Sequence, residues 1–182
     1  MLDTSPILPN IRTTAGWPGR WGGRLSEQAV ANVLSRYARS LDSGDFAALG
    51  ELFAQGSVRF ATIDAVYTGA AAVQHLYEDI VQVRDGRPGT MHVTSNVEVY
   101  LDGDTSALAH SYYTVLQATA SNPLAVVAAG EYADRLHKSD GSWLFTERVI
   151  SIHFEGDLSE HLLASPFREP PSVRSTSQPV AR

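Results

Sequence analysis

The sequence predicts an α+β domain in which helices come first and an antiparallel sheet follows. Apolar residues recur at helical spacing in the first half of the chain, and the second half consists of long β-rich segments joined by short turn sequences. A length of 182 residues with 43% hydrophobic content is enough for one domain with a substantial core and short for two. We therefore expect helices packed on one face of a curved, mostly antiparallel sheet.

Three helices are expected, over residues 26–42, from Phe46 until Gly56, and over 70–83. Ser26 is a suitable N-cap for the first helix. Two short strands, 57–64 and 65–68, should separate the second helix from the third. The helical stripes predict these buried residues: Val30, Leu34, Leu41, Phe46, Leu49 and Phe53.

Four long strands are expected in the second half, over residues 90–101, 106–120, 126–138 and 142–154. The three connections carry Asp-Gly-Asp, Ser-Asn-Pro and Ser-Asp-Gly, residues that favour tight turns. Four strands with apolar residues on both faces cannot all be covered by helices on one side, so the outer face is expected to form a homodimer.

The ends of the chain are expected to differ from the domain, which we assign to residues 25–158. Residues 1–24 are rich in proline and glycine and predict an irregular arm, while Trp17 and Trp21 favour its folding back onto the domain or a partner subunit. In the tail, 159–182, the helical fragment SEHLL should dock and the remainder should be disordered.

Composition excludes several functions. A net charge of −6 without a basic run argues against nucleic acid or an anionic membrane as a partner. No apolar segment is long enough to span a bilayer, and we expect a cytoplasmic protein. The chain has no cysteine, which removes disulfides and thiolate chemistry. Motifs for serine hydrolysis, zinc-dependent proteolysis and nicotinamide binding are missing from the sequence, so no cofactor is expected.

Asp42 occupies an unusual position at the end of the first predicted helix. It continues the i+4 series Val30, Leu34, Ala38 and should point inward, although the negative end of the helix dipole disfavours an acid there. One interpretation is a turn in which the Asp42 side chain accepts hydrogen bonds from backbone amides. The other is that Asp42 belongs to an acid/base pair.

His92 is the candidate partner, near the start of the first long strand. Alternation places His92, Thr94, Asn96 and Glu98 on one face of that strand and the valines on the other. In a half-buried strand this face meets solvent, whereas in a sheet wrapped around a cavity it lines the pocket. The periodicity is compatible with both arrangements.

Three blocks of the sequence, RYARSLDSGDFAALGELF, GTMHVTSNVEVYLDGDTSALAHSYYTV and GEYADRLHKSDGSWLFTERVI, resemble the SnoaL-like branch of the nuclear-transport-factor-2-like superfamily, over about residues 26–158. This resemblance implies a cone-shaped α+β barrel of three helices and a strongly bent sheet around an apolar pocket, commonly dimeric. Members include scytalone dehydratase, bile acid 7α-dehydratase, a dehydrochlorinase, polyketide cyclases and the small subunits of ring-hydroxylating dioxygenases.

The resemblance also implies roles for residues. In the dehydratases, an aspartate ending the first helix pairs with a histidine early in the third strand, and these positions are Asp42 and His92; a tyrosine five residues before the aspartate falls on Tyr37. The implied function is a cofactor-independent dehydratase, isomerase or cyclase that acts on a hydrophobic polycyclic or polyketide-like molecule. The alternative is a non-catalytic ligand-binding protein or a partner subunit like the dioxygenase small subunits.

Further candidates would bind substrate if their strand faces line the pocket, and these are His110, Tyr112, Tyr113, Glu131 and Arg148, with Arg135 beside Glu131. Two clusters carry metal-ligand types, His75 with Asp79 and His153 with Glu155 and Asp157. Neither has a complete ligand set with defined spacing, so no metal is expected.

Overall fold

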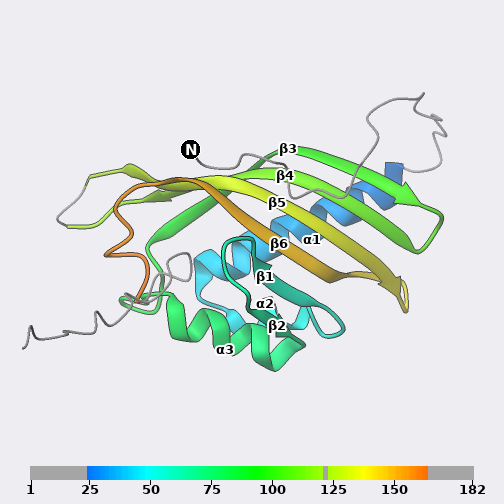
Figure 1. The fold of residues 1–182 in the computed structure, drawn as a ribbon, viewed down its shortest axis with the longest axis horizontal. Helices are drawn as coiled ribbons and strands as arrows, with labels where there is room; N and C mark the ends of the chain where they lie inside the picture. Colours follow the sequence, from blue (N-terminus) through cyan, green and yellow to red (C-terminus); the bar gives the residue numbers. More distant parts are fainter. Residues whose placement is uncertain (1–23, 121–122, 164–182) are drawn as a thin grey trace, which may run out of the picture.

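The computed structural model describes residues 24–120 and 123–163, and within them helices come first and a bent sheet follows, which confirms the predicted α+β class (Figure 1). The expected N-terminal arm, with Trp17 and Trp21, and the tail after Leu163 lie outside the described residues. The elements are α1 (Arg24–Ser43), α2 (Phe46–Glu51), β1 (Ser57–Phe60), β2 (Val66–Thr68), α3 (Ala70–Ile80), β3 (Thr90–Asp102), β4 (Ser106–Gln117), β5 (Ala125–Ser139) and β6 (Ser142–Glu155).

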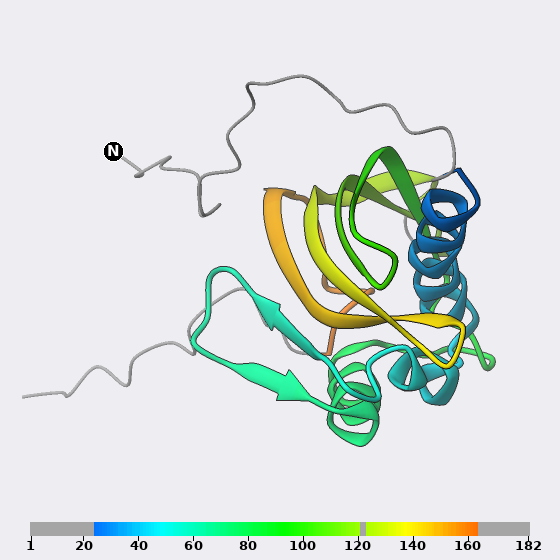
Figure 2. The same cartoon turned by 90° about the vertical axis from the view of Figure 1, so that its right-hand side faces the viewer.

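The six strands form one sheet in the order β2-β1-β6-β5-β4-β3. All neighbouring strands are antiparallel except β1 and β6, which run parallel. The sheet bends strongly, with α1 along one side and α3 near the β1–β2 hairpin (Figure 2). Because β2 and β3 remain as edges, the barrel expected from the resemblance is open.

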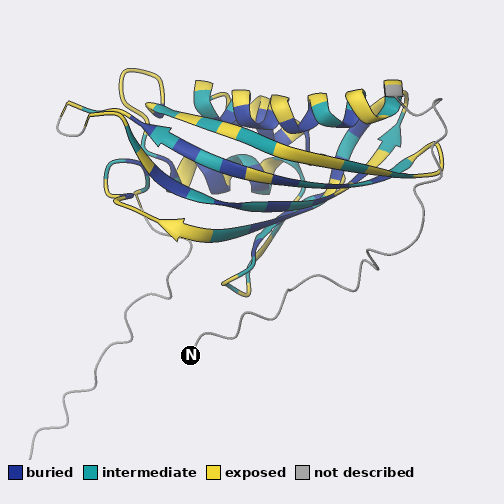
Figure 3. Cartoon of the chain, turned by 90° about the horizontal axis from the view of Figure 1, so that it is seen from above, coloured by how far each residue is buried: buried dark blue, intermediate teal, exposed yellow. Residues whose placement is uncertain are grey.

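The core lies between the helices and the inner face of the sheet (Figure 3). All six residues predicted from the helical stripes are buried: Val30, Leu34, Leu41, Phe46, Leu49 and Phe53. Burial alternates almost perfectly along β4, as expected for a strand with one face on the core. Among the described residues no helix has the length and apolar character needed to cross a membrane.

A β-bulge in β3 makes the single alternation predicted for that strand wrong. The register with β4 shifts between Ser95 and Glu98, and Asn96 has a φ of 50°. Before the bulge His92 faces the inside of the sheet; beyond it Val99 packs against the core, so its neighbour Glu98 points outward. An inserted residue reverses the two faces of a strand, which sequence periodicity does not reveal.

After β6 the chain turns back onto the domain through residues 157–163, which we call the C-terminal clasp. The amide side chain of Gln82 donates hydrogen bonds to the carbonyl oxygens of Ser159 (2.6 Å) and Leu162 (3.0 Å). Gln117 of β4 donates to the carbonyl of Glu160 at 3.1 Å. The clasp is therefore fastened both to the segment after α3 and to the sheet; the SEHLL fragment contacts the domain, but as a turn and a β-bridge to Val81 rather than as the expected helix.

Candidate active site

Asp42 and His92 are in direct contact. The Nδ1 atom of His92 lies 2.6 Å from Oδ1 of Asp42, and the backbone amide of His92 donates to Oδ2 of Asp42 at 2.8 Å. The carboxylate thus joins the last turn of α1 to the start of β3. Because a carboxylate only accepts hydrogen bonds, Nδ1 carries the proton and Nε2 is left as the basic nitrogen.

Asp42 does not stabilise the turn after α1 in the way that the sequence suggested. Its carboxylate does accept a backbone hydrogen bond, but from His92 on a distant strand rather than from the adjoining turn. The turn is instead stabilised by Asp45, whose side chain accepts from the amide of Ala48 at 3.0 Å and caps α2. The His92 side chain is 6% exposed and that of Asp42 21%, so the pair lies mostly out of water.

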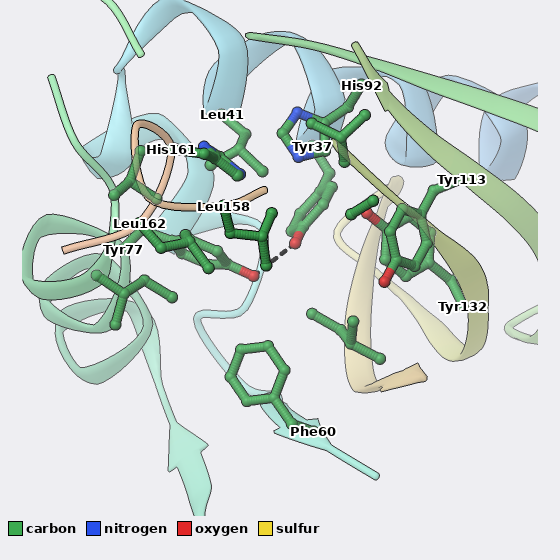
Figure 4. A pocket seen from close by; sticks show the side chains of 15 residues that line it. Tyr37, Leu41, Phe60, Tyr77, His92, Tyr113, Tyr132, Leu158, His161 and Leu162 are labelled. Atoms are coloured by element: carbon green, nitrogen blue, oxygen red, sulfur yellow. Dashed lines mark hydrogen bonds between the residues drawn. The ribbon is translucent and has the colours of Figure 1, made fainter. Parts of the chain in front are cut away.

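His92 forms part of the wall of a cavity of about 50 Å³ (Figure 4). The wall is otherwise mostly apolar and aromatic. Its fifteen residues come from α1, α3 and the residue after it, the inner face of the sheet and the clasp, and the polar ones are Tyr37, Tyr77, His92, Tyr113, Tyr132 and His161.

Two tyrosine hydroxyls meet at one side of this cavity. Tyr37 and Tyr77 have their hydroxyl oxygens 2.5 Å apart, and both side chains are buried (Figure 4). Burial raises the pKa of Tyr37, although the nearby positive charge of Arg148 opposes this, and burial raises the pKa of Tyr77 well above its usual value. Both hydroxyls therefore stay protonated at neutral pH and can act as hydrogen-bond donors.

Arg148 lies behind the cavity wall and is not part of it. Its guanidinium forms two 2.7 Å hydrogen bonds to Asp134 and lies 4.0 Å from the ring centroids of both Tyr37 and Tyr132. Burial acts to lower the pKa of Arg148, but the attraction of Asp134 outweighs it and raises that pKa. A permanent positive charge thus supports the Tyr37 ring from behind.

The remaining candidates are divided between the two faces of the sheet. Tyr113 lines the cavity with His92, as its position on the inner face requires. Tyr112 pairs with Glu131, and both lie on the outer face, where His153 approaches Glu131 at 3.7 Å. His110 also alternates with inward residues of β4 and lies on that outer face. The structure therefore does not bring His110, Tyr112 or Glu131 to the cavity.

Tyr77, Tyr132 and His161 line the cavity without having been singled out from the sequence. Tyr77 lies at helical spacing from Val73 and Ile80 on α3, and His161 lies in the fragment predicted to dock. Neither pattern distinguishes a packing residue from a cavity residue. Among the residues that the structure describes, no group of three or more histidine, aspartate or glutamate side chains is placed to hold a metal ion.

The profile of the SnoaL-like domain family matches residues 24–149 of the sequence. The chain belongs to this SnoaL-like family. Comparison of the chain with curated protein sequences gives no match.

Solved structures of low sequence identity share the fold of this SnoaL-like domain. A proposed scytalone dehydratase from Novosphingobium aromaticivorans is 24% identical, with a TM-score of 0.63 over 76% of this chain and 91% of that one. Rv3472 of Mycobacterium tuberculosis, a protein of unknown function, is 23% identical with a TM-score of 0.61 over 74% and 78%. ActVI-ORFA from Streptomyces coelicolor is 21% identical with a TM-score of 0.57 over 69% and 95%.

Proposed function

We propose that this SnoaL-like protein is a cofactor-independent acid/base enzyme, a dehydratase, isomerase or cyclase, that acts on a hydrophobic polycyclic or polyketide-like molecule. The observation that carries the proposal is the 2.6 Å contact between Asp42 and Nδ1 of His92 in the wall of an apolar cavity. A protein that only carries a ligand or supports another subunit does not need a partly buried carboxylate to fix the tautomer of a cavity histidine.

In an elimination, Nε2 of His92 removes a proton from a carbon atom next to an electron-withdrawing group. The C–H electron pair becomes the new double bond, the neighbouring C–O bond breaks, and the oxygen leaves with its electron pair and receives a proton to form water. Asp42 stabilises the imidazolium that exists in between. In an isomerisation, the same imidazolium returns its proton to a different carbon atom.

Tyr37 is the proposed donor to the oxygen on which negative charge develops. Its hydroxyl is directed toward the cavity and contacts Tyr77 at 2.5 Å, and a second hydroxyl in line strengthens the first as a donor. Its raised pKa means that it is protonated when substrate arrives. In a cavity lined mostly by apolar and aromatic side chains, such a donor stabilises developing charge more strongly than water would.

The cavity must enlarge to admit the proposed substrates. At about 50 Å³ it is well below the roughly 300 Å³ at the lower end of small-molecule pockets. Leu158, His161 and Leu162 of the clasp form one side of the wall and are held by a few hydrogen bonds rather than by a strand ladder. We infer that substrate enters by displacement of the clasp.

A general carbon acid tests the proposal without knowledge of the natural substrate. The isoxazole ring of 5-nitro-1,2-benzisoxazole opens when a base removes the proton on C3: the C–H pair forms the nitrile, the N–O bond breaks, and the coloured phenolate product is measured by absorbance. We expect the wild-type protein to accelerate this reaction, and His92→Ala and Asp42→Asn to lower the rate at least tenfold. His75→Ala, a change on the exposed side of α3, is the matched control and should have no effect.

Two results would contradict the proposal. Equal rates for the wild type and a folded His92→Ala variant would show that this histidine is not the base. Tight binding of aromatic ligands without any proton transfer would favour the alternative, a ligand-binding protein or partner subunit.

A further inference from the structure

His161 is the second histidine of the cavity, and it is brought there by the clasp. Its ring centroid lies 5.9 Å from that of His92, and the residue is 6% exposed (Figure 4). The clasp is held at this point by the main chain, because the amide of His161 donates to the carbonyl of Leu158 and its own carbonyl accepts from the amide of Gln82, both at 2.9 Å. The imidazole is therefore not what fastens the clasp.

The imidazole of His161 is expensive to bury. Its Nδ1 atom is buried and has no hydrogen-bond partner among the described residues. An unpaired polar atom out of water costs free energy that an apolar side chain of similar size does not. Packing alone would favour leucine or phenylalanine at this position, so the histidine lowers the stability of the fold.

The charge state of His161 suits a hydrogen-bond donor rather than a base. Burial, and next the proximity of His92, lower the pKa of His161 to about 4, against the opposing effect of Asp42. At neutral pH the ring is uncharged, with one N–H and one lone pair. A neutral imidazole can donate a hydrogen bond to an oxygen without giving up its proton, since the imidazolate is too basic to form.

We propose that His161 is a substrate-contacting residue whose neutral imidazole hydrogen-bonds a hydroxyl or carbonyl oxygen of an aromatic ligand, beside His92 in the cavity wall. This role rests on the proposed function. When His92 takes the proton from a carbon next to a carbonyl, the C–H pair becomes a carbon–carbon double bond and the carbonyl π pair moves onto oxygen. His161 stabilises that oxygen while its own N–H bond remains intact.

The test compares two ligands of nearly equal shape, 4-fluorophenol and 4-fluorotoluene, whose binding is measured by ¹⁹F NMR. The wild-type protein should bind the phenol more tightly than the toluene. In His161→Leu this preference should fall by roughly three- to tenfold, the value of one hydrogen bond. In the matched control His75→Leu the preference should not change.

A purely structural role for His161 predicts a different pattern. His161→Leu would then weaken the binding of both ligands together and would melt at a lower temperature than the wild type, whereas we expect its melting temperature to be unchanged or higher. An undiminished preference for the phenol in His161→Leu overturns the proposal, and so does a wild-type protein that binds both ligands equally.

A measurement on the wild type serves if His161→Leu does not fold. In protein labelled with ¹⁵N-histidine, 4-fluorophenol but not 4-fluorotoluene should shift the imidazole signals of a histidine that stays neutral at pH 5. No such shift overturns the proposal. If the wild-type protein does not open the benzisoxazole but still prefers the phenol through His161, the proposed enzyme function fails and the proposed contact of His161 stands. The failure of the proposed function can therefore be told apart from the failure of this inference.

Discussion

Arg148 and Asp134 form a bidentate ion pair in which both side chains are completely buried. The pair lies behind Tyr37, so it supports the cavity wall without contacting the cavity. Leaving one member of such a pair alone in the core exposes a charge to a medium that cannot solvate it.

We therefore predict that Asp134→Ala lowers the free energy of unfolding by about 3–5 kcal/mol. Replacing both residues, Asp134→Leu with Arg148→Met, should cost much less, because no charge is then left unpaired. Urea unfolding measures both. The control is Arg59→Ala, which breaks a half-exposed ion pair with Glu147 and should cost about 1 kcal/mol or less. An Asp134→Ala variant as stable as the control would mean that water reaches the guanidinium.

Asp42 and His92 should behave as one unit in catalysis. With 5-nitro-1,2-benzisoxazole, the double variant Asp42→Asn/His92→Ala should be scarcely slower than His92→Ala alone, because Asp42 acts through the histidine. The measurement compares the rates of the wild type, the two single variants and the double variant. If the rate losses of the two single variants multiply in the double variant, Asp42 has a role that is independent of His92.

Tyr37→Phe should slow the same reaction roughly tenfold by removing one donor to the developing phenolate. It should also lower the free energy of unfolding by about 1 kcal/mol, since the buried hydroxyl of Tyr77 loses its partner. Tyr100→Phe, on an exposed part of β3, is the control for both measurements. An unchanged rate in Tyr37→Phe would limit Tyr37 to packing.

Stability should depend on pH through His161, whose titratable neighbours are His92 and Asp42. Its pKa is about 4 in the folded protein and 6.5 unperturbed, so between these values the unfolded chain binds a proton that the folded chain does not. The free energy of unfolding should therefore fall as pH is lowered through this window, by about 2 kcal/mol between pH 7 and pH 5. Urea unfolding at pH 7 and pH 5 measures this difference, and in His161→Leu the part of the difference that comes from the histidine should be missing.

The outer face of the sheet should form a homodimer. Apolar side chains from three strands are exposed together there, with Met91 and Val93 on β3, Tyr112 on β4 and Val126 on β5. Light scattering should give about twice the 19.7 kDa mass of the chain. Val93→Glu should yield monomers that keep the fold. The control Thr62→Glu, in the exposed turn between β1 and β2, should remain dimeric. A wild-type monomer at micromolar concentration would contradict the prediction.

The order and type of the elements could be predicted from the sequence because period and turn residues agree along the chain. The strand predicted over 126–138 is β5 at Ala125–Ser139, and Asp140 and Gly141 form its turn to β6 with φ values of 49° and 80°. Local patterns of this kind are set by neighbours in sequence.

The candidate site was only partly predictable, because it depends on which face of each strand turns inward. Asp42 and His92 were linked by the family resemblance, and the structure brings them together. Tyr112 and Tyr113 were indistinguishable in sequence, yet only Tyr113 reaches the cavity. His161 could not be found from periodicity, since the clasp has none and is positioned by hydrogen bonds to distant residues.

The parallel pairing of β1 with β6 also sets an order of assembly. Residues 57–60 gain their second neighbour only from residues 147–150, so nearly ninety residues must be synthesised before β1 is enclosed in the sheet. Contacts between such distant segments form slowly, because a long loop must close first. On the ribosome, the helices and the β1–β2 hairpin should therefore wait with an open edge until the last strand emerges, and a chain truncated before β6 should be prone to aggregation.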